Sequence, residues 1–206
     1  MTDRHVPPPG ERFNFAQHLI ERNAQRPAKT AFIDDHGQLS YGELADRVRR
    51  MAAALQACGV RREERVLLLM TDGIDWPVSF LGALYAGIVP VAVNTLLTAD
   101  DYAFMLQNSR AQVALVSASL LPTLRDAMAL AEGQGGHEVA TVVVSGAARV
   151  PAAANASPVT QDLSELLARQ APMAAPAGTA PDDPGFWLYS SGSTGRPKGA
   201  LHTHAN

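Results

Sequence analysis

Hydrophobic and polar positions follow two different spacings along the chain, one typical of helices and the other of buried strands. In the segment that begins at residue 44, apolar side chains recur every three or four positions, as on the buried face of a helix. These side chains are Leu44, Val48, Met51 and Leu55. Four short stretches are instead mostly apolar, and the first contains the continuous run 66–69, which is typical of a strand covered on both faces of a parallel sheet. They span residues 65–70, 89–93, 113–117 and 139–145.

Local signals predict where several elements begin and end. Ser40 with Glu43, and Thr98 with Asp101, have the spacing of capping boxes at helix starts. Gly59 is placed to follow the end of the first of these helices. The remaining predicted elements are helices over residues 15–23, 74–86, 98–108 and 120–131, and a hairpin with strands over 29–34 and 38–40. Alternating strands and helices indicate an α/β fold with a mainly parallel sheet flanked by helices on both faces.

Residues 146–185 differ in composition from the rest of the chain, being rich in Ala, Pro and Gly. We interpret this segment as a surface connection that contains one short helix over residues 162–170. A short apolar strand over 186–189 follows it. We expect residues 1–13 to form a flexible N-terminus and residues 14–206 to belong to one partial domain.

Composition and charge narrow the class of protein. The chain has 206 residues, with 17 basic and 20 acidic side chains, which argues against a nucleic-acid binder. Cys58 is the single cysteine, so no internal disulfide can form and a reducing, cytoplasmic location is expected.

Residues 76–99 carry no charge, but Pro77 and Pro90 interrupt them, which favours a helix and a strand over a membrane span. The first 15 residues lack the apolar core of a secretory signal.

The chemistry-bearing motif comes directly after the strand at 186–189. It combines glycines, hydroxyl side chains and one lysine, in the order Ser190, Ser191, Gly192, Ser193, Thr194, Gly195, Arg196, Pro197, Lys198 and Gly199. Glycines let backbone N–H groups approach an anion, hydroxyls add hydrogen bonds, and lysine adds a compact positive charge. The chain otherwise uses arginine, since Lys29 is its only other lysine. These residues predict a phosphate-binding loop that is not a Walker A motif, with a solvated Gly/Ser linker as the alternative.

Two histidines and three aromatic residues are weaker candidates for function. His202 and His204 are two positions apart, but no cysteine or carboxylate accompanies them at ligand spacing, so packing beside the loop is favoured and no metal ligand is predicted. We interpret Trp76, Phe186 and Trp187 as core residues and not as a ligand-binding stack.

The run from Tyr189 to Gly199 resembles the phosphate-loop motif of the adenylate-forming superfamily of AMP-dependent synthetases and ligases. The wider stretch 186–204 is similar to the version found in benzoate and 4-hydroxybenzoate CoA ligases. Further similarity lies at residues 34–44, 80–91, 93–98 and 101–102, so the resemblance covers nearly all of residues 14–206.

The resemblance implies the first part of the large N-terminal domain of the acyl-CoA synthetase fold. It implies an aryl-CoA ligase that uses ATP, Mg²⁺, CoA and a small carboxylic acid such as benzoate or hydroxybenzoate, with a homodimer as the expected full-length assembly. The loop, from Ser190 through Gly195 with Lys198 and Gly199, would hold the ATP phosphates, and Lys198 would also offset charge on the departing pyrophosphate. Family members are longer, so the chain is expected to be an N-terminal fragment. A nucleotide- or polyphosphate-binding module without catalysis, or an inactive truncation with exposed sheet edges, remains as an alternative.

Overall fold

The computed structural model describes residues 8–146, 157–190 and 195–206, and its centre is a seven-stranded sheet. In space the strands follow the order β7-β6-β5-β3-β4-β8-β9, and every neighbouring pair is parallel except β8 with β9. The strands are β3 (Arg65–Leu69), β4 (Val89–Ala92), β5 (Val113–Ser117), β6 (Thr141–Ser145), β7 (Val159–Asp162), β8 (Pro184–Ser190) and β9 (Lys198–Thr203). A separate antiparallel hairpin consists of β1 (Thr30–Asp34) and β2 (Gly37–Ser40).

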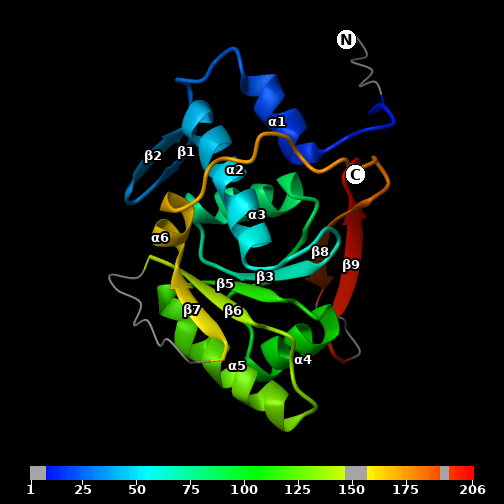
Figure 1. Ribbon diagram of the computed structural model, residues 1–206. Helices are drawn as coiled ribbons and strands as arrows, with labels where there is room; N and C mark the ends of the chain where they lie inside the picture. The colour runs from blue at the N-terminus through cyan, green and yellow to red at the C-terminus, as the bar shows by residue number, and fades with distance from the viewer. Residues whose placement is uncertain (1–7, 147–156, 191–194) are drawn as a thin grey trace, which may run out of the picture.

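Helices cover both faces of the sheet, as the sequence predicts (Figure 1). They are α1 (Phe15–Asn23), α2 (Tyr41–Ala57), α3 (Asp75–Tyr85), α4 (Ala99–Ser109), α5 (Leu121–Gly133) and α6 (Leu163–Ala168), with a 3₁₀ turn at Ala118–Leu120. The first three helices and α6 pack on one face, and α4 and α5 pack on the other. Successive residues of β3 point to opposite faces, so Val66 and Leu68 join the first core while Leu67 and Leu69 join the second.

The local start and stop signals are confirmed. The side chains of Ser40 and Thr98 accept hydrogen bonds from the backbone N–H groups three residues later. The side chains of Glu43 and Asp101 accept hydrogen bonds from the backbone N–H groups of the two N-cap residues, which completes both capping boxes. Gly59 has a φ of 86° directly after the C-cap of α2, a conformation that glycine adopts without steric cost. The predicted apolar face of α2 is buried throughout.

The segment interpreted as a surface connection contributes more to the fold than its composition suggests, so that interpretation was wrong in part. Residues Val159–Asp162 form β7, which extends the sheet by pairing in parallel with β6. The short helix predicted over residues 162–170 is confirmed as α6, and its leucines join the core. The strand was missed because it has a single apolar residue, Val159, and its other side chains are polar. An edge strand can form from such a sequence since the neighbouring strand supplies the hydrogen bonds.

The uncharged stretch over residues 76–99 folds as most of α3 followed by β4. Within the described ranges, no helix is both long enough and apolar enough to cross a membrane.

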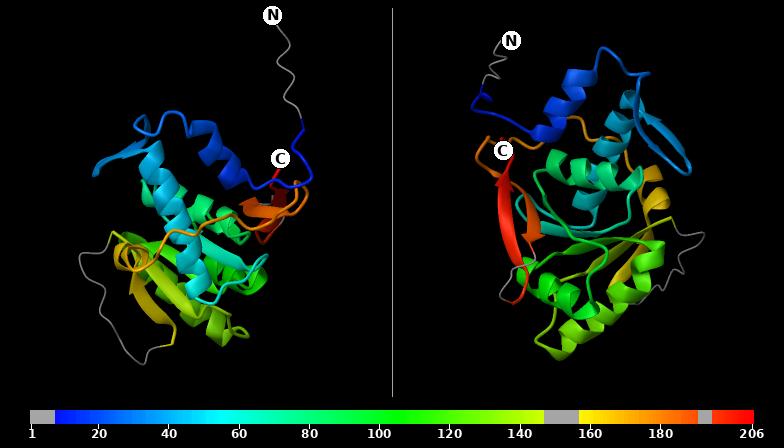
Figure 2. Two further views of the ribbon diagram at one scale, coloured as in Figure 1. Left: turned by 45° about the horizontal axis from the view of Figure 1, so that its top comes forward. Right: turned by 180° about the vertical axis from the view of Figure 1, so that it is seen from behind.

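The segment before α1 is fixed to residues that lie far along the sequence. Asn14 donates from its side-chain amide to the carbonyl oxygen of Leu84 at 2.8 Å, and the backbone N–H of Phe13 donates to the carbonyl of Thr179 at 2.8 Å. The backbone N–H of Phe15 donates to Nδ1 of His204 at 3.3 Å. The end of the chain therefore lies beside the start of α1, as both views in Figure 2 show.

Candidate phosphate-binding site

The predicted phosphate loop connects the two antiparallel strands β8 and β9. Ser190 and Lys198 lie directly opposite each other in the strand register, so the two ends of the loop are held together. Since β8 runs parallel to β4, the loop leaves the carboxyl end of the parallel strands. Ligands of open α/β sheets bind at this edge.

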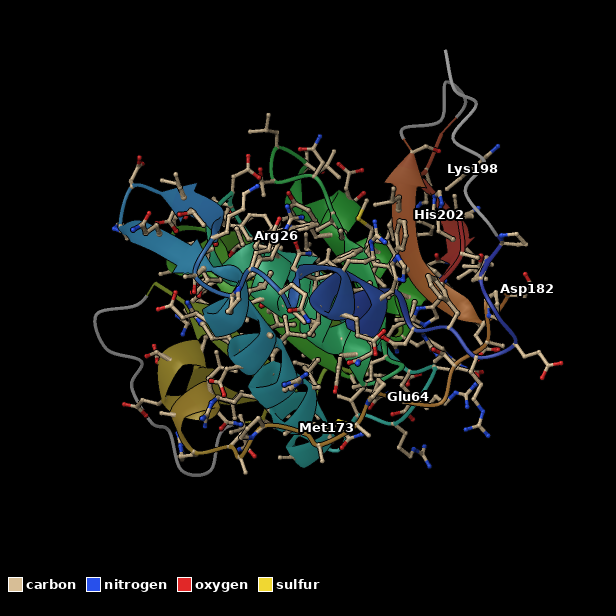
Figure 3. The ribbon with its side chains drawn as sticks, turned by 90° about the horizontal axis from the view of Figure 1, so that it is seen from above. Arg26, Glu64, Met173, Asp182, Lys198 and His202 are labelled. Atoms are coloured by element: carbon tan, nitrogen blue, oxygen red, sulfur yellow. The ribbon has the colours of Figure 1, made fainter. Side chains whose placement is uncertain are left out.

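The structure describes part of the predicted loop. Ser190 is the exposed last residue of β8, and Lys198 is the exposed first residue of β9. Lys198 and His202 lie on the same outer strand (Figure 3). Among the described residues, Lys198 forms no salt bridge, which leaves its ammonium group available to an anion. Ser191, Gly192, Ser193 and Thr194 lie outside the described residues.

The two described glycines of the loop differ in what a side chain would meet. Gly195 has a φ of 136°, which L side chains rarely adopt. Gly199 lies opposite Tyr189, and a Cβ atom there would lie 3.4 Å from Tyr189 Cε1, an ordinary van der Waals contact. The backbone conformation therefore favours glycine at position 195, whereas position 199 has room for a small side chain.

Helix α4 contacts both ends of the loop, through residues that the sequence reasoning did not single out. The hydroxyl of Tyr189 donates to Oδ1 of Asn108 at 2.7 Å, directly before the loop. The guanidinium carbon of Arg196 lies 5.1 Å from the centroid of the Phe104 ring, near the end of the loop. Phe104 and Asn108 are four residues apart, so they share one face of α4. That spacing is visible in the sequence, but the partner strand is not.

The protonation state of Tyr189 suits its role as a donor. Burial disfavours the charged phenolate and raises the pKa of Tyr189 to about 12. The phenol keeps its proton at neutral pH and donates a hydrogen bond to the side-chain oxygen of Asn108.

The two histidines near the loop have different environments. His202 stacks on Phe186 with 4.6 Å between ring centroids, whereas His204 is buried and accepts the backbone N–H of Phe15. Desolvation lowers the pKa of His204, which favours the neutral imidazole. Throughout the part of the chain that the structure describes, no three His, Cys, Asp or Glu side chains gather as a metal site. These described residues therefore do not supply a complete ligand set for Mg²⁺.

The three aromatic residues interpreted as core are only partly shielded from solvent, and they lie on two sides of the sheet. Trp76 stacks on Phe80, Phe80 meets Phe186 edge-on, and Phe186 stacks on His202. Trp187 faces the opposite side and packs against the second core. The row of rings joins α3 to the strands that carry the loop.

An open crevice of about 1150 Å³ lies near the carboxyl ends of β3, β5 and β6. The hairpin, α1 and α3 form its walls. Its floor is polar, since the hydroxyls of Thr71 and Ser117 lie 3.1 Å apart and Ser145 donates to Asp75. The connections after β3 and β5 leave toward opposite faces of the sheet, so the crevice marks the switch point of the topology.

A mainly parallel sheet covered on both faces, with a Gly/Ser/Thr-rich loop and Lys198 at its carboxyl edge, is typical of nucleotide-binding α/β proteins. Comparison with known families agrees with this class. The family model of AMP-binding enzymes matches residues 19–206, and the chain belongs to that family.

Individual relatives are aryl-CoA ligases. The chain is 45% identical over 199 residues to a benzoate–CoA ligase of Thauera aromatica, covering 95% of this chain and 35% of the relative. It is 41% identical over 196 residues to a 4-hydroxybenzoate–CoA/benzoate–CoA ligase of Rhodopseudomonas palustris, covering 94% and 34%. The chain thus spans about a third of the length of the curated relatives that it matches.

Solved structures show the same fold. A benzoate CoA ligase from Burkholderia xenovorans LB400 superposes with a TM-score of 0.78 at 43% identity, covering 94% of this chain and 35% of that one. An anthranilate CoA ligase in complex with anthranoyl-AMP gives a TM-score of 0.85 at 27% identity, covering 100% of this chain and 37% of that one. The predicted fold class is therefore confirmed, as part of an acyl-CoA synthetase fold.

Proposed function

We propose that this chain supplies the phosphate-binding part of an aryl-CoA ligase, which joins benzoate or a hydroxybenzoate to CoA at the expense of ATP. The observation that carries the proposal is the loop between β8 and β9, with Lys198 at its end, in a chain 45% identical to a benzoate–CoA ligase. The single, half-buried thiol Cys58 supports a reducing, cytoplasmic setting.

The proposed reaction has two steps. An oxygen of the carboxylate attacks the α-phosphorus of ATP, a new C–O–P linkage forms, and the bond to the departing pyrophosphate breaks. The sulfur of the CoA thiolate then attacks the carbonyl carbon, a thioester forms, and AMP leaves with the bonding electrons. The first step makes the acid a better electrophile because AMP is a better leaving group than oxide.

The role of this chain lies in the first step, where negative charge grows on the leaving pyrophosphate. Ser190, the backbone around Gly195 and Gly199, and the Lys198 ammonium are proposed to hold the β- and γ-phosphates. The same proposal extends to Ser191, Gly192, Ser193 and Thr194 on sequence grounds alone. Fixed donors and a cation stabilise developing charge without having to reorganise. Mg²⁺ is proposed to accompany the ATP phosphates, with none of the described residues assigned as its ligand.

The experiment is acid-dependent exchange of labelled pyrophosphate into ATP. The native polypeptide is captured from its source with an antibody raised against residues 1–206, its intact mass is measured, and it is assayed with benzoate and hydroxybenzoates. The expected result is exchange that requires one of these acids, followed by thioester formation when CoA is added. Exchange that is absent with every acid, despite tight MgATP binding, would instead favour a nucleotide-binding module.

Replacing Lys198 tests the assigned role directly. Lys198→Ala is expected to lower the exchange rate by about 10²-fold, the effect of losing one preorganised group that stabilises charge. Lys29→Ala is the matched control, because Lys29 is the only other lysine and its side chain is exposed directly before β1, outside the candidate loop. Equal rates in the two variants would remove Lys198 from the mechanism.

A further inference from the structure

Both ends of the candidate phosphate loop rest on one face of helix α4. At the entrance, the Tyr189 hydroxyl donates to Asn108 at 2.7 Å. At the exit, Arg196 lies over the Phe104 ring at 5.1 Å. The two contacts differ in chemistry, one being a hydrogen bond and the other a cation–π interaction, yet they come from side chains one helical turn apart.

Helix α4 is itself firmly held, so it can act as a fixed support. Its opposite face is buried against β3 and α5 through Tyr102, Met105 and Leu106. Its capping box fixes its first turn. Gln107 joins it to α5 through hydrogen bonds to the carbonyls of Ala131 and Gln134 at 3.2 and 3.1 Å.

The described strand pairing supports the end of the β8–β9 ribbon from one side only. β9 is an edge strand whose outer side has no neighbour among the described residues, and four of its six residues are exposed. The register between β4 and β8 ends at Leu188, so the end of the β8–β9 ribbon that carries Lys198 projects beyond the strand that pairs with it and would move most if the ribbon bent. The contacts to α4 oppose that motion on both sides of the loop.

We propose that Asn108 and Phe104 are positioning residues, which lock the ends of the phosphate loop to α4 through Tyr189 and Arg196. This inference rests on the proposed role of the loop in binding ATP phosphates. The lock also separates the two cations of the loop, because Arg196 is held over the ring while Lys198 remains without an ion pair among the described residues.

The first test measures the loop ends without any ligand. Amide hydrogen exchange is followed in peptides that cover β8 and β9 in Asn108→Leu, Phe104→Leu and the unaltered chain. Both variants are expected to exchange about three- to fivefold faster at these strands, the range for losing one exposed hydrogen bond or cation–π contact. Gln107→Ala is the matched control, since it loses two hydrogen bonds from the same helix but none to the loop.

Conservative variants separate positioning from general stability. Asn108→Asp keeps an oxygen that accepts the Tyr189 proton and is expected to restore exchange to within about twofold of the unaltered chain. Tyr189→Phe and Asn108→Leu remove the same bond, so the double variant is expected to equal either single variant. The proposal would be overturned if the increases in exchange rate multiplied in the Tyr189→Phe, Asn108→Leu double variant. It would also be overturned if Gln107→Ala raised the exchange rate as much as Asn108→Leu does.

The second test uses the native-length polypeptide and pyrophosphate exchange. Asn108→Leu and Phe104→Leu are expected to lower kcat about three- to fivefold while the urea midpoint changes no more than in Gln107→Ala. If the unaltered protein shows no acid-dependent exchange, the proposed ligase function fails, and the amide-exchange results still decide whether α4 holds the loop. Full kcat in both variants would exclude a positioning role.

Discussion

The hydroxyl of Ser145 donates to Oδ2 of Asp75 at 2.6 Å, although the two residues lie 70 positions apart. The bond joins the carboxyl end of β6 to the first turn of α3. The other oxygen of the same carboxylate pairs with Arg47 of α2 at 2.7 Å. One carboxylate therefore holds together a strand and two helices at the floor of the crevice.

Removing that carboxylate is expected to destabilise the protein. Asp75→Ala leaves Arg47 and Ser145 without their partner, which costs about 1–3 kcal/mol for partly buried groups. The free energy of unfolding is measured by urea denaturation. Glu165→Gln is the control, because the Arg169–Glu165 pair is exposed and contributes only about 0–1 kcal/mol. An Asp75→Ala variant as stable as Glu165→Gln would show that the network is not needed.

A methyl group at Gly82 is expected to force α2 and α3 apart. A Cβ atom there would lie 2.5 Å from both Cβ and Cγ of Met51 on the facing helix. Overpacking of this kind costs about 1–3 kcal/mol, and the better helix propensity of alanine offsets less than about 1 kcal/mol of it. Gly133→Ala is the control and is not expected to destabilise the protein. No atom lies within 4 Å of a Cβ atom built at this position, and Gly133 is part of helix α5. Thermal denaturation should therefore show a lower Tm for Gly82→Ala and no decrease in Tm for Gly133→Ala.

Gly185 is a second position with no room for a side chain. A Cβ atom would come within 2.8 Å of the backbone carbon and oxygen of Thr203, so β8 and β9 would have to separate. Gly185→Ala is expected to destabilise the protein by about 1–3 kcal/mol and to speed amide exchange in β9. Gly178→Ala has open space around it and serves as the control. Unchanged exchange in β9 would contradict this account.

His204 is expected to make stability depend on pH. Burial is the main cause that lowers the pKa of His204, Arg62 acts in the same direction, and Asp183 opposes them. Because the folded-state pKa lies below the unfolded value of about 6.5, the unfolded chain binds the proton first as pH falls. The stabilising effect of the neutral ring is complete above about pH 6.5 and is lost as pH falls toward the folded-state pKa. Protonation also removes the acceptor for the Phe15 N–H.

The pH effect is measured as the free energy of unfolding between about pH 5 and 8. His204→Asn places an amide oxygen near the position of Nδ1 and does not titrate, so its stability should fall less on acidification. Parallel curves for the two proteins would rule out His204 as the source.

Much of the fold could be predicted from the sequence because its signals are local. The capping boxes at Ser40 and Thr98 need only the next three residues, and the apolar runs of the parallel strands need no distant partner. β7 was missed because its polar residues form a strand only beside β6. An edge position of this kind leaves no pattern in the segment itself.

The residues of the candidate loop could be predicted from the sequence, but the side chains that contact the loop could not. The glycines, hydroxyls and Lys198 stand in one continuous run, so their chemistry could be read directly. The support from Asn108 could not be read, because it lies 81 residues from Tyr189. The opposite environments of His202 and His204 depend on Phe186 and Phe15, which are also supplied by the tertiary structure.

The bond between Phe15 and His204 sets an order for folding on the ribosome. The two residues are 189 positions apart, so at about 5–20 residues per second α1 waits roughly 10–40 seconds for its last partner to be synthesised. Val48, Met51 and Leu68 can bury one another long before then, since their partners are close in sequence. Helix α1 can already pack against α3 through Ile20 and the Asn14–Leu84 bond, so nascent chains stalled before residue 204 should carry α1 docked but without this last hydrogen bond.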